Sequence, residues 1–247
     1  MTSNSSTALI TGGTSGIGFA TARKLAQLGI HVLLVGRNAE RGKTAVDEIR
    51  AAGGQVDFIP SDLHDIASVH TVAKKAIELG NGQVDILINN VGVFPFGPTH
   101  EMTEEQFDRV FSINVKVPYF LVAELAPLMA GRGKGAIVNI STMVADYGAP
   151  GMSLYSSSKA AINLLTRTWA AEYGPKGVRV NAVSPGPTRT EGTEAMGEGL
   201  EQLAAQGPAG RPATADEIAE AIVFLASDRA SFIYGAKLAV DGGRTAI

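Results

Sequence analysis

The chain has 247 residues, a formal net charge of −3 and no cysteine. The small negative charge argues against a nucleic-acid partner, and the lack of cysteine excludes disulfides, thiolate metal sites and a cysteine nucleophile. Hydrophobic residues make up 45% and charged residues 18%, which predicts one globular domain over residues 1–247. The start, MTSNSSTALITGG, has no signal-peptide pattern and no long apolar run follows, so we expect a soluble cytoplasmic protein without membrane partners.

Short apolar runs recur along the chain, and stretches with helical periodicity lie between them. The runs predict strands at residues 7–11, 31–35, 56–60, 84–89, 135–140, 178–183 and 237–241. Helices are predicted over 17–28, 40–52 and 66–79, each followed by glycine, and at two capping boxes, Thr103 with Gln106 and Thr214 with Glu217. Continuously apolar strands are buried on both faces. The pattern therefore predicts an α/β fold, a doubly wound, mostly parallel seven-stranded sheet with helices on both faces.

A glycine-rich turn, TGGTSGIG at residues 11–18, follows the first predicted strand. Glycines there let the backbone approach a pyrophosphate, and the next helix offers free N–H groups at its N-terminus. The spacing of the glycines departs from the usual dinucleotide fingerprint. The candidate cofactor contacts in this turn are Gly12, Thr14, Ser15, Gly16, Ile17 and Gly18.

The end of the second strand bears on which dinucleotide binds. A carboxylate there would accept hydrogen bonds from a ribose 2′-hydroxyl, whereas an arginine can pair with a 2′-phosphate. This chain has Gly36 and Arg37. The sequence therefore favours NADP(H) over NAD(H), although Arg37 could also be a solvated loop cation.

Tyr155 and Lys159 lie four positions apart in SLYSSSKAA, so they are neighbours on one helix face. A nearby cation lowers the pKa of a phenol toward the range useful for proton transfer. The same spacing also occurs on solvated helix faces, so alone it is weak evidence.

These motifs occur together with Asp62, NNVG (89–92), Asn114, SPGPTRT (184–190) and VDGG (240–243). The ordered set resembles the short-chain dehydrogenase/reductase family over essentially the whole chain, including its carbonyl reductases and its 3-oxoacyl-[acyl-carrier-protein] reductases. The resemblance implies a Rossmann fold, Tyr155 as catalytic acid/base, and Lys159 as the residue that lowers its pKa and holds the nicotinamide ribose. It also implies that Asn114 holds a water that links the lysine to solvent.

The resemblance implies further cofactor contacts. Asp62 and Leu63 would flank the adenine, while Asn90 and Gly92 would line the adenine-side ribose and pyrophosphate path. The nicotinamide and phosphate side would be met by Pro185, Gly186, Thr188 and Thr190.

Two positions depart from the family pattern. Thr142 stands where the family usually has the serine that polarises the substrate, and Ser141 precedes it. Threonine keeps the hydroxyl, and neighbouring strand residues face opposite sides, so we assign the role to Thr142 and keep Ser141 as the alternative. Val91 replaces an alanine, and we attach no functional conclusion to it.

The candidate substrate wall is mostly apolar, with no obvious arginine, so a hydrophobic or aryl ketone fits best. Its residues are Phe94, Phe96, Val144, Tyr147, Met152 and Met196. A Gly-, Glu- and Ala-rich stretch at 191–210 predicts a substrate lid over 191–212, with a surface insertion as the alternative. The four histidines stand at no ligand spacing, so no metal site is expected.

The sequence thus predicts an NADPH-dependent carbonyl reductase acting on a ketone or aldehyde. A 3-oxoacyl-[acyl-carrier-protein] reductase and an NADPH-binding sensor or scaffold with little turnover remain alternatives. The apolar C-terminal run at 230–247 resembles the segment through which family members pack as tetramers, so a homotetramer is expected. A terminal strand packed within its own domain would fit the same run.

Overall fold

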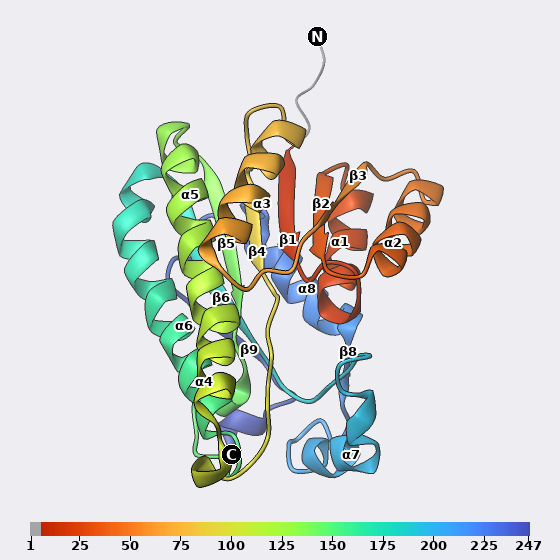
Figure 1. Cartoon of the computed structure of the whole chain (residues 1–247), viewed down its shortest axis with the longest axis vertical. Coiled ribbons are helices and arrows are strands. Elements are labelled where there is room, and N and C mark those ends of the chain that lie inside the picture. The colour runs from red at the N-terminus through yellow and green to blue at the C-terminus, as the bar shows by residue number, and fades with distance from the viewer. Residues whose placement is uncertain (1–5) are drawn as a thin grey trace.

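The computed structural model describes residues 6–247. Residues 1–5, on which part of the expectation about an N-terminal signal rests, lie outside the described residues. The centre of the fold is a seven-stranded sheet in the order β3-β2-β1-β4-β5-β6-β9 (Figure 1). Each pair of neighbouring strands is parallel, which confirms the predicted sheet. The strands are β1 Thr7–Thr11, β2 His31–Gly36, β3 Val56–Pro60, β4 Ile86–Asn89, β5 Gly135–Ile140, β6 Val178–Pro185 and β9 Lys237–Val240.

Two short strands were not predicted. β7 (Thr188–Arg189) and β8 (Ala213–Thr214) pair in parallel and form a separate small sheet. Two residues are too few to show a period of two, so their sequence carries no strand signal. The pair joins the two ends of the predicted lid segment, residues 191–212.

Helices cover both faces of the sheet, as a doubly wound fold requires. They are α1 Gly16–Gln27, α2 Ala39–Ala51, α3 Ile66–Leu79, α4 Glu104–Phe111, α5 Val117–Gly131, α6 Ser153–Tyr173, α7 Glu198–Ala204 and α8 Ala215–Ala226. α1, α2 and α8 share one apolar core, and α3, α5 and α6 share the other (Figure 1). Along β1, Ile10 enters the first core and Leu9 the second, because side chains alternate across a strand.

The predicted capping boxes at Thr103 and Thr214 begin α4 and α8. A third box, in which Asp65 and Ser68 cap α3, was missed because serine replaces the usual Glu or Gln at its third position. α4 and α5 are joined by a π-helical turn, Ser112–Lys116, so residues Glu104–Gly131 form a 28-residue helical stretch. It is long and apolar enough to cross a membrane by composition, but half of its most apolar window is buried inside the protein.

The carboxyl ends of the strands gather the predicted motifs at one edge of the sheet. The glycine-rich turn follows β1, Asn90 follows β4, and Thr142 follows β5. From β1 the chain builds outward through β2 to β3 and then crosses back to β4 on the other side of β1, so the order of the strands reverses there. Open α/β sheets bind ligands in the crevice outside the strand ends at this reversal point.

Candidate active site

The turn between β1 and α1 takes a shape that only glycine allows. Gly12 and Gly16 have φ angles of +63° and +51°. A Cβ atom on Gly18 would lie 2.2 Å from the carbonyl oxygen of Gly12, so no larger residue fits there. Ser15, the N-cap of α1, makes no side-chain cap hydrogen bond, and the first turn of α1 holds no acidic residue. The turn therefore presents uncapped amides at the positive end of a helix, which suits an anion such as a pyrophosphate.

Asn90 holds this turn in place. Its Nδ2 donates to the carbonyl oxygens of Thr11 and Gly12 at 3.0 and 3.1 Å, and its backbone N–H donates to Thr11 Oγ1 at 3.0 Å. With both amide hydrogens used in this way, Asn90 shapes the cradle from behind. Its predicted place along the ribose path stays a prediction.

A pocket of about 200 Å³ adjoins the glycine-rich turn. Arg37 Nε lies 3.6 Å from Asp62 Oδ1 across its mouth, and both side chains are more than half exposed. Sequence reasoning missed Arg41, a cation in the first turn of α2, where the helix dipole disfavours positive charge. A cation at this unfavourable position in the sequence could have indicated an anion-binding role for Arg41. The predicted residues that line the pocket are Gly12, Thr14, Ser15, Arg37, Asp62, Leu63 and Gly92, and the added ones include Asn38, Arg41 and Ser61.

A glycine cradle, an uncapped helix end and two cations beside one pocket fit a dinucleotide phosphorylated on its ribose. The turn suits the pyrophosphate, because the first turn of α1 has no side-chain cap and no acidic residue, while Gly18 lets the helix pack closely against the Gly12 carbonyl. Arg37 and Arg41 match a 2′-phosphate, because guanidinium groups pair with phosphate oxygens.

Tyr155 and Lys159 lie on the first two turns of α6. Lys159 is 4% exposed, and its Nζ donates to the carbonyl oxygen of Ile140 at 2.7 Å and lies 6.0 Å from the centroid of the Tyr155 ring. Burial lowers the pKa of Lys159 to about 8, so the ammonium is still mostly protonated at pH 7.

The pKa of the Tyr155 hydroxyl differs from the predicted one in direction. Burial raises the pKa of Tyr155 to about 12, and a side-chain hydrogen bond with Thr142 opposes this rise only in part. The predicted lowering of this pKa by Lys159 is therefore wrong for the chain by itself. Removing water from a phenol disfavours the phenolate, and here the ammonium is turned toward Ile140.

The hydroxyls of Thr142 and Ser141 have different neighbours. Thr142 is the one that interacts with Tyr155. Ser141 is 2% exposed, and its buried Oγ has no hydrogen-bond partner among the described residues. The geometry favours Thr142 as the hydroxyl beside the acid, while its role toward a substrate stays a prediction.

Asn114 lies in the π-helical turn between α4 and α5, a distortion frequent at functional sites. Its Oδ1 accepts from the Val93 N–H at 2.8 Å, and its Nδ2 donates to the Val93 carbonyl at 2.9 Å and to Ser158 Oγ at 3.0 Å. A Cβ on Gly92 would lie 3.3 Å from Lys159 Nζ and 3.4 Å from Asn114 Oδ1. Gly92 thus leaves open the space where the lysine and the asparagine meet, and only Oδ1 of the Asn114 side chain can accept another hydrogen bond.

The predicted substrate wall is only partly assembled around Tyr155. The Phe94 ring is 45% exposed and lies 5.9 Å from the Tyr155 ring, centroid to centroid, while Phe96 packs over Gly151. Val144 is 7% exposed and offers little surface. Met152 precedes α6, and Met196 lies in the short helical turn Glu194–Met196.

Tyr147 carries a feature that sequence reasoning overlooked. The guanidinium carbon of Arg244 lies 4.9 Å from the centroid of the Tyr147 ring. An arginine therefore does stand beside the predicted wall, brought there from the C-terminal end of the chain. No spacing in the sequence could have indicated this long-range contact.

The segment after β6 returns to the glycine-rich turn. Pro185 ends β6, and a Cβ on Gly186 would lie 2.7 Å from the Asp241 Cα, so glycine is required there. Thr188 Oγ1 donates to the Gly186 carbonyl at 2.9 Å, and Thr190 packs against Gly16. The predicted lid segment that follows contains α7, and its movement stays a prediction.

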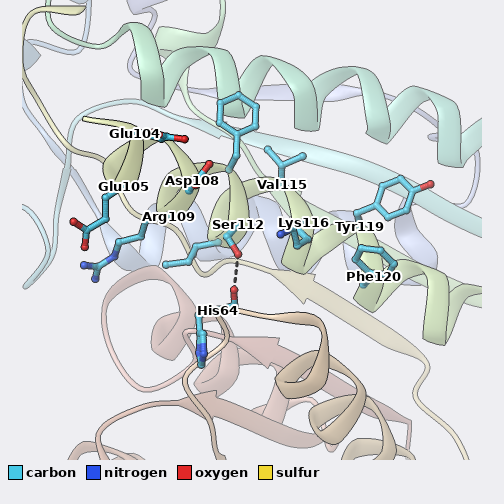
Figure 2. Close-up of a pocket in the computed structure, with 12 residues that line it drawn as sticks. His64, Glu104, Glu105, Asp108, Arg109, Ser112, Val115, Lys116, Tyr119 and Phe120 are labelled. Carbon is cyan, nitrogen blue, oxygen red and sulfur yellow. Dashed lines mark hydrogen bonds between the residues drawn. The ribbon is translucent and has the colours of Figure 1, made fainter. Parts of the chain in front are cut away.

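A larger pocket than the one beside the glycine-rich turn lies elsewhere. It is an open groove of about 960 Å³ along α4 and the start of α5, and His64 lies opposite Ser112 in it (Figure 2). Its rim carries Glu104, Glu105 and Asp108, and Ser112 donates a hydrogen bond to the His64 carbonyl. None of the predicted catalytic residues lines it, so its size does not make it the active site.

Comparisons with known proteins show which family the chain belongs to. The profile of the family described as "Enoyl-(Acyl carrier protein) reductase" matches residues 12–245. The cyclopentanol dehydrogenase of Comamonas sp. is 36% identical (98% of each chain), and the 3-oxoacyl-[acyl-carrier-protein] reductase of Thermotoga maritima is also 36% identical (95% of this chain, 96% of the relative).

Two solved structures are similar over their whole length. One, called a short chain dehydrogenase/reductase family protein, is 48% identical with a TM-score of 0.91, and the alignment covers 98% of each chain. The other is a putative NAD(P)-dependent gluconate 5-dehydrogenase from Beutenbergia cavernae with bound NADP at low occupancy. It is 36% identical with a TM-score of 0.93, over 98% of this chain and 97% of that one. On this evidence the chain belongs to the short-chain dehydrogenase/reductase family of oxidoreductases.

Proposed function

We propose that the chain is an NADPH-dependent reductase that transfers hydride to the carbonyl carbon of a ketone or aldehyde and yields an alcohol. The observation that carries the proposal is the cluster of Tyr155, Lys159 and Thr142 at the strand ends, next to the glycine cradle. The NADP bound in the Beutenbergia cavernae structure supports the cofactor assignment.

A dinucleotide bound beside the glycine-rich turn would supply the hydride, and the side chains at the strand ends would hold and donate the proton. Tyr155, with its pKa raised to about 12, is protonated at neutral pH, which is the state that can donate a proton to the carbonyl oxygen. Thr142 can orient that oxygen through its hydroxyl. Lys159, charged below pH 8, stabilises the negative charge that develops on the oxygen.

The nucleotide preference follows from charge. Arg37 and Arg41 both line the pocket beside the glycine-rich turn, and a 2′-phosphate would complete their pairing. Arg37 also contacts Asp62, so part of its charge is already neutralised. We therefore expect Arg41 to contribute at least as much as Arg37 to the discrimination between NADPH and NADH.

A second candidate function is reduction of a 3-oxoacyl group carried as a thioester on acyl carrier protein. The Thermotoga maritima relative favours it, and the description of the matching family names the same carrier, although for reduction of an enoyl group. The cyclopentanol dehydrogenase of Comamonas and the exposed Phe94 ring beside Tyr155 favour a small apolar ketone. A sensor or scaffold that binds NADPH with little turnover is the third possibility, and the presence of Tyr155 and Lys159 together speaks against it.

The test is oxidation of NADPH and NADH, followed by absorbance, with cyclic and aryl ketones and with a 3-oxoacyl thioester. Tyr155→Phe should lower kcat by about 10²- to 10⁴-fold, the usual contribution of a positioned general acid. Tyr119→Phe removes the same hydroxyl from α5 and should change little. Equal activity of Tyr155→Phe and wild type would contradict the mechanism, and NADPH binding without turnover of any substrate would favour the sensor.

We also propose that the protein works in the cytoplasm as a homotetramer. Phe232 is 98% exposed, and Leu238 is 36% exposed on β9, the edge strand of the sheet. An edge strand with exposed apolar side chains is a ready surface for pairing. Light scattering coupled to gel filtration should give four times the mass of 25.6 kDa, whereas a monomer would contradict this assembly.

A further inference from the structure

An acidic side chain from the lid segment reaches the glycine-rich turn. A Cβ atom on Gly16, the first residue of α1, would lie 3.2 Å from Thr190 Cβ and 3.6 Å from Oε2 of Glu191. This is the helix end whose amides no side chain caps. The Glu191 carboxylate thus lies at the positive end of α1, where the cradle would receive a pyrophosphate.

The backbone that carries Glu191 is firmly held. Thr193 Oγ1 accepts from the Thr190 N–H at 3.0 Å and donates to the Thr188 carbonyl at 2.7 Å, while the Thr193 N–H donates to the Thr190 carbonyl at 3.0 Å. These bonds close a tight turn over residues 188–193. The position of Glu191 is therefore set by the fold, and only its side chain is free to rotate.

No structural role explains the carboxylate. Within residues 6–247 the Glu191 side chain makes no ion pair or hydrogen bond, and the residue is exposed. The neighbouring cation Arg189 is paired with Glu201 at 2.7 Å instead. Removing the charge of Glu191 therefore breaks no bond that stabilises the turn.

We propose that Glu191 competes with the cofactor pyrophosphate for the N-terminus of α1 and so weakens dinucleotide binding and speeds its release. The inference rests on the proposed function, because the competing ligand is NADP(H). A carboxylate and a pyrophosphate are drawn to the same amides, and at a few ångströms like charges repel strongly even near the surface. The exposed side chain can swing aside, so the repulsion reduces affinity without preventing binding.

The experiment compares Glu191→Gln with Glu194→Gln, which removes the same charge from the same lid segment, in a fluorescence titration with NADPH at low salt. Glu191→Gln should lower Kd about tenfold, and Glu194→Gln should change it less than about twofold. The difference should shrink in about 1 M salt, because exposed charges are screened. Adenosine 2′-phosphate, which lacks the pyrophosphate, should bind wild type and Glu191→Gln equally.

Three results would overturn the inference: an unchanged Kd for NADPH in Glu191→Gln, a higher Kd, or an equal gain with adenosine 2′-phosphate. A higher Kd would mean that the carboxylate accepts hydrogen bonds from the cofactor. If wild type binds NADPH and reduces ketones while the variants match it, only this inference fails. If wild type binds no NADPH at all, the proposed function fails with it.

Discussion

Lys159 should cost the protein stability, and its replacement by methionine should therefore stabilise the fold. Burial lowers the pKa of this ammonium from its ordinary 10.5 to about 8. A shift of one in pKa corresponds to about 1.4 kcal/mol, so keeping the charge in the folded state at neutral pH costs about 3 kcal/mol. The variant also loses the hydrogen bond from Nζ to the Ile140 carbonyl, which lowers its free energy of unfolding by about 1 kcal/mol. The net expectation for Lys159→Met is about 2 kcal/mol of added stability.

The effect of Lys159→Met on the free energy of unfolding should depend on pH. Between pH 8 and 10.5 the unfolded chain keeps the proton of Lys159 while the folded chain loses it, so the unfolded state binds more protons. The free energy of unfolding of the wild type should then rise with pH relative to the variant. The advantage of Lys159→Met should be complete below pH 8 and disappear as the pH approaches 10.5.

The assay is urea unfolding at fixed protein concentration, without cofactor, at a series of pH values. Lys74→Met, which removes an exposed lysine on α3, is the matched control and should stay within about 0.5 kcal/mol of wild type. At neutral pH the midpoint of thermal unfolding of Lys159→Met should rise by roughly 4 to 8 °C. A variant less stable than wild type, or a gain that does not change with pH, would refute the reasoning from desolvation.

Three further outcomes are expected. Gly18→Ala should abolish NADPH binding in titrations, because its methyl group would lie 2.2 Å from the Gly12 carbonyl, whereas Gly131→Ala meets no atom within 4 Å and should bind normally. Arg41→Leu should weaken NADPH binding by about tenfold and leave NADH binding unchanged, and equal losses for both nucleotides would contradict a 2′-phosphate contact. Thr142→Ser should retain most of the reductase activity and Thr142→Val should lose about 10²-fold in kcat/KM. If Thr142→Ser and Thr142→Val were equally active, the Thr142 hydroxyl would have no part in the mechanism.

Local patterns were enough to predict most of the fold. Five of the seven sheet strands were found to within one residue at each end because continuous apolar runs have few alternatives to a buried strand, and β6 was found except for its last two residues. β4 starts later than its apolar run suggested. The Asp85 backbone still bonds to Thr7 and Ala136, but the Asp85 carboxylate accepts the Thr7 N–H at 2.8 Å in place of a backbone carbonyl, and the regular strand begins at Ile86. A contact 78 residues distant in sequence leaves no trace in a local pattern.

The sequence indicated which residues would gather at the strand ends, but not the contacts that they make there. The motifs named the residues at the strand ends because parallel strands bring their carboxyl ends to one edge. The structure then adds contacts between distant segments, such as Arg244 on Tyr147 and Glu191 at Gly16. Residue types and spacings along one segment do not encode which side chain of another segment will lie against it.

The pKa of Tyr155 shows most clearly why burial decides chemistry. The spacing of Tyr155 and Lys159 indicated a cation that lowers the pKa of the phenol, whereas the folded chain holds the phenol neutral and brings the pKa of the lysine down instead. Desolvation disfavours the charged form of both groups, so it raises the pKa of the phenol and lowers the pKa of the ammonium. A phenol that keeps its proton up to high pH is poised to donate it, which suits reduction of a carbonyl. Oxidation of an alcohol needs the phenolate, so that direction should accelerate as the pH is raised, while reduction should decline once Lys159 loses its charge above pH 8.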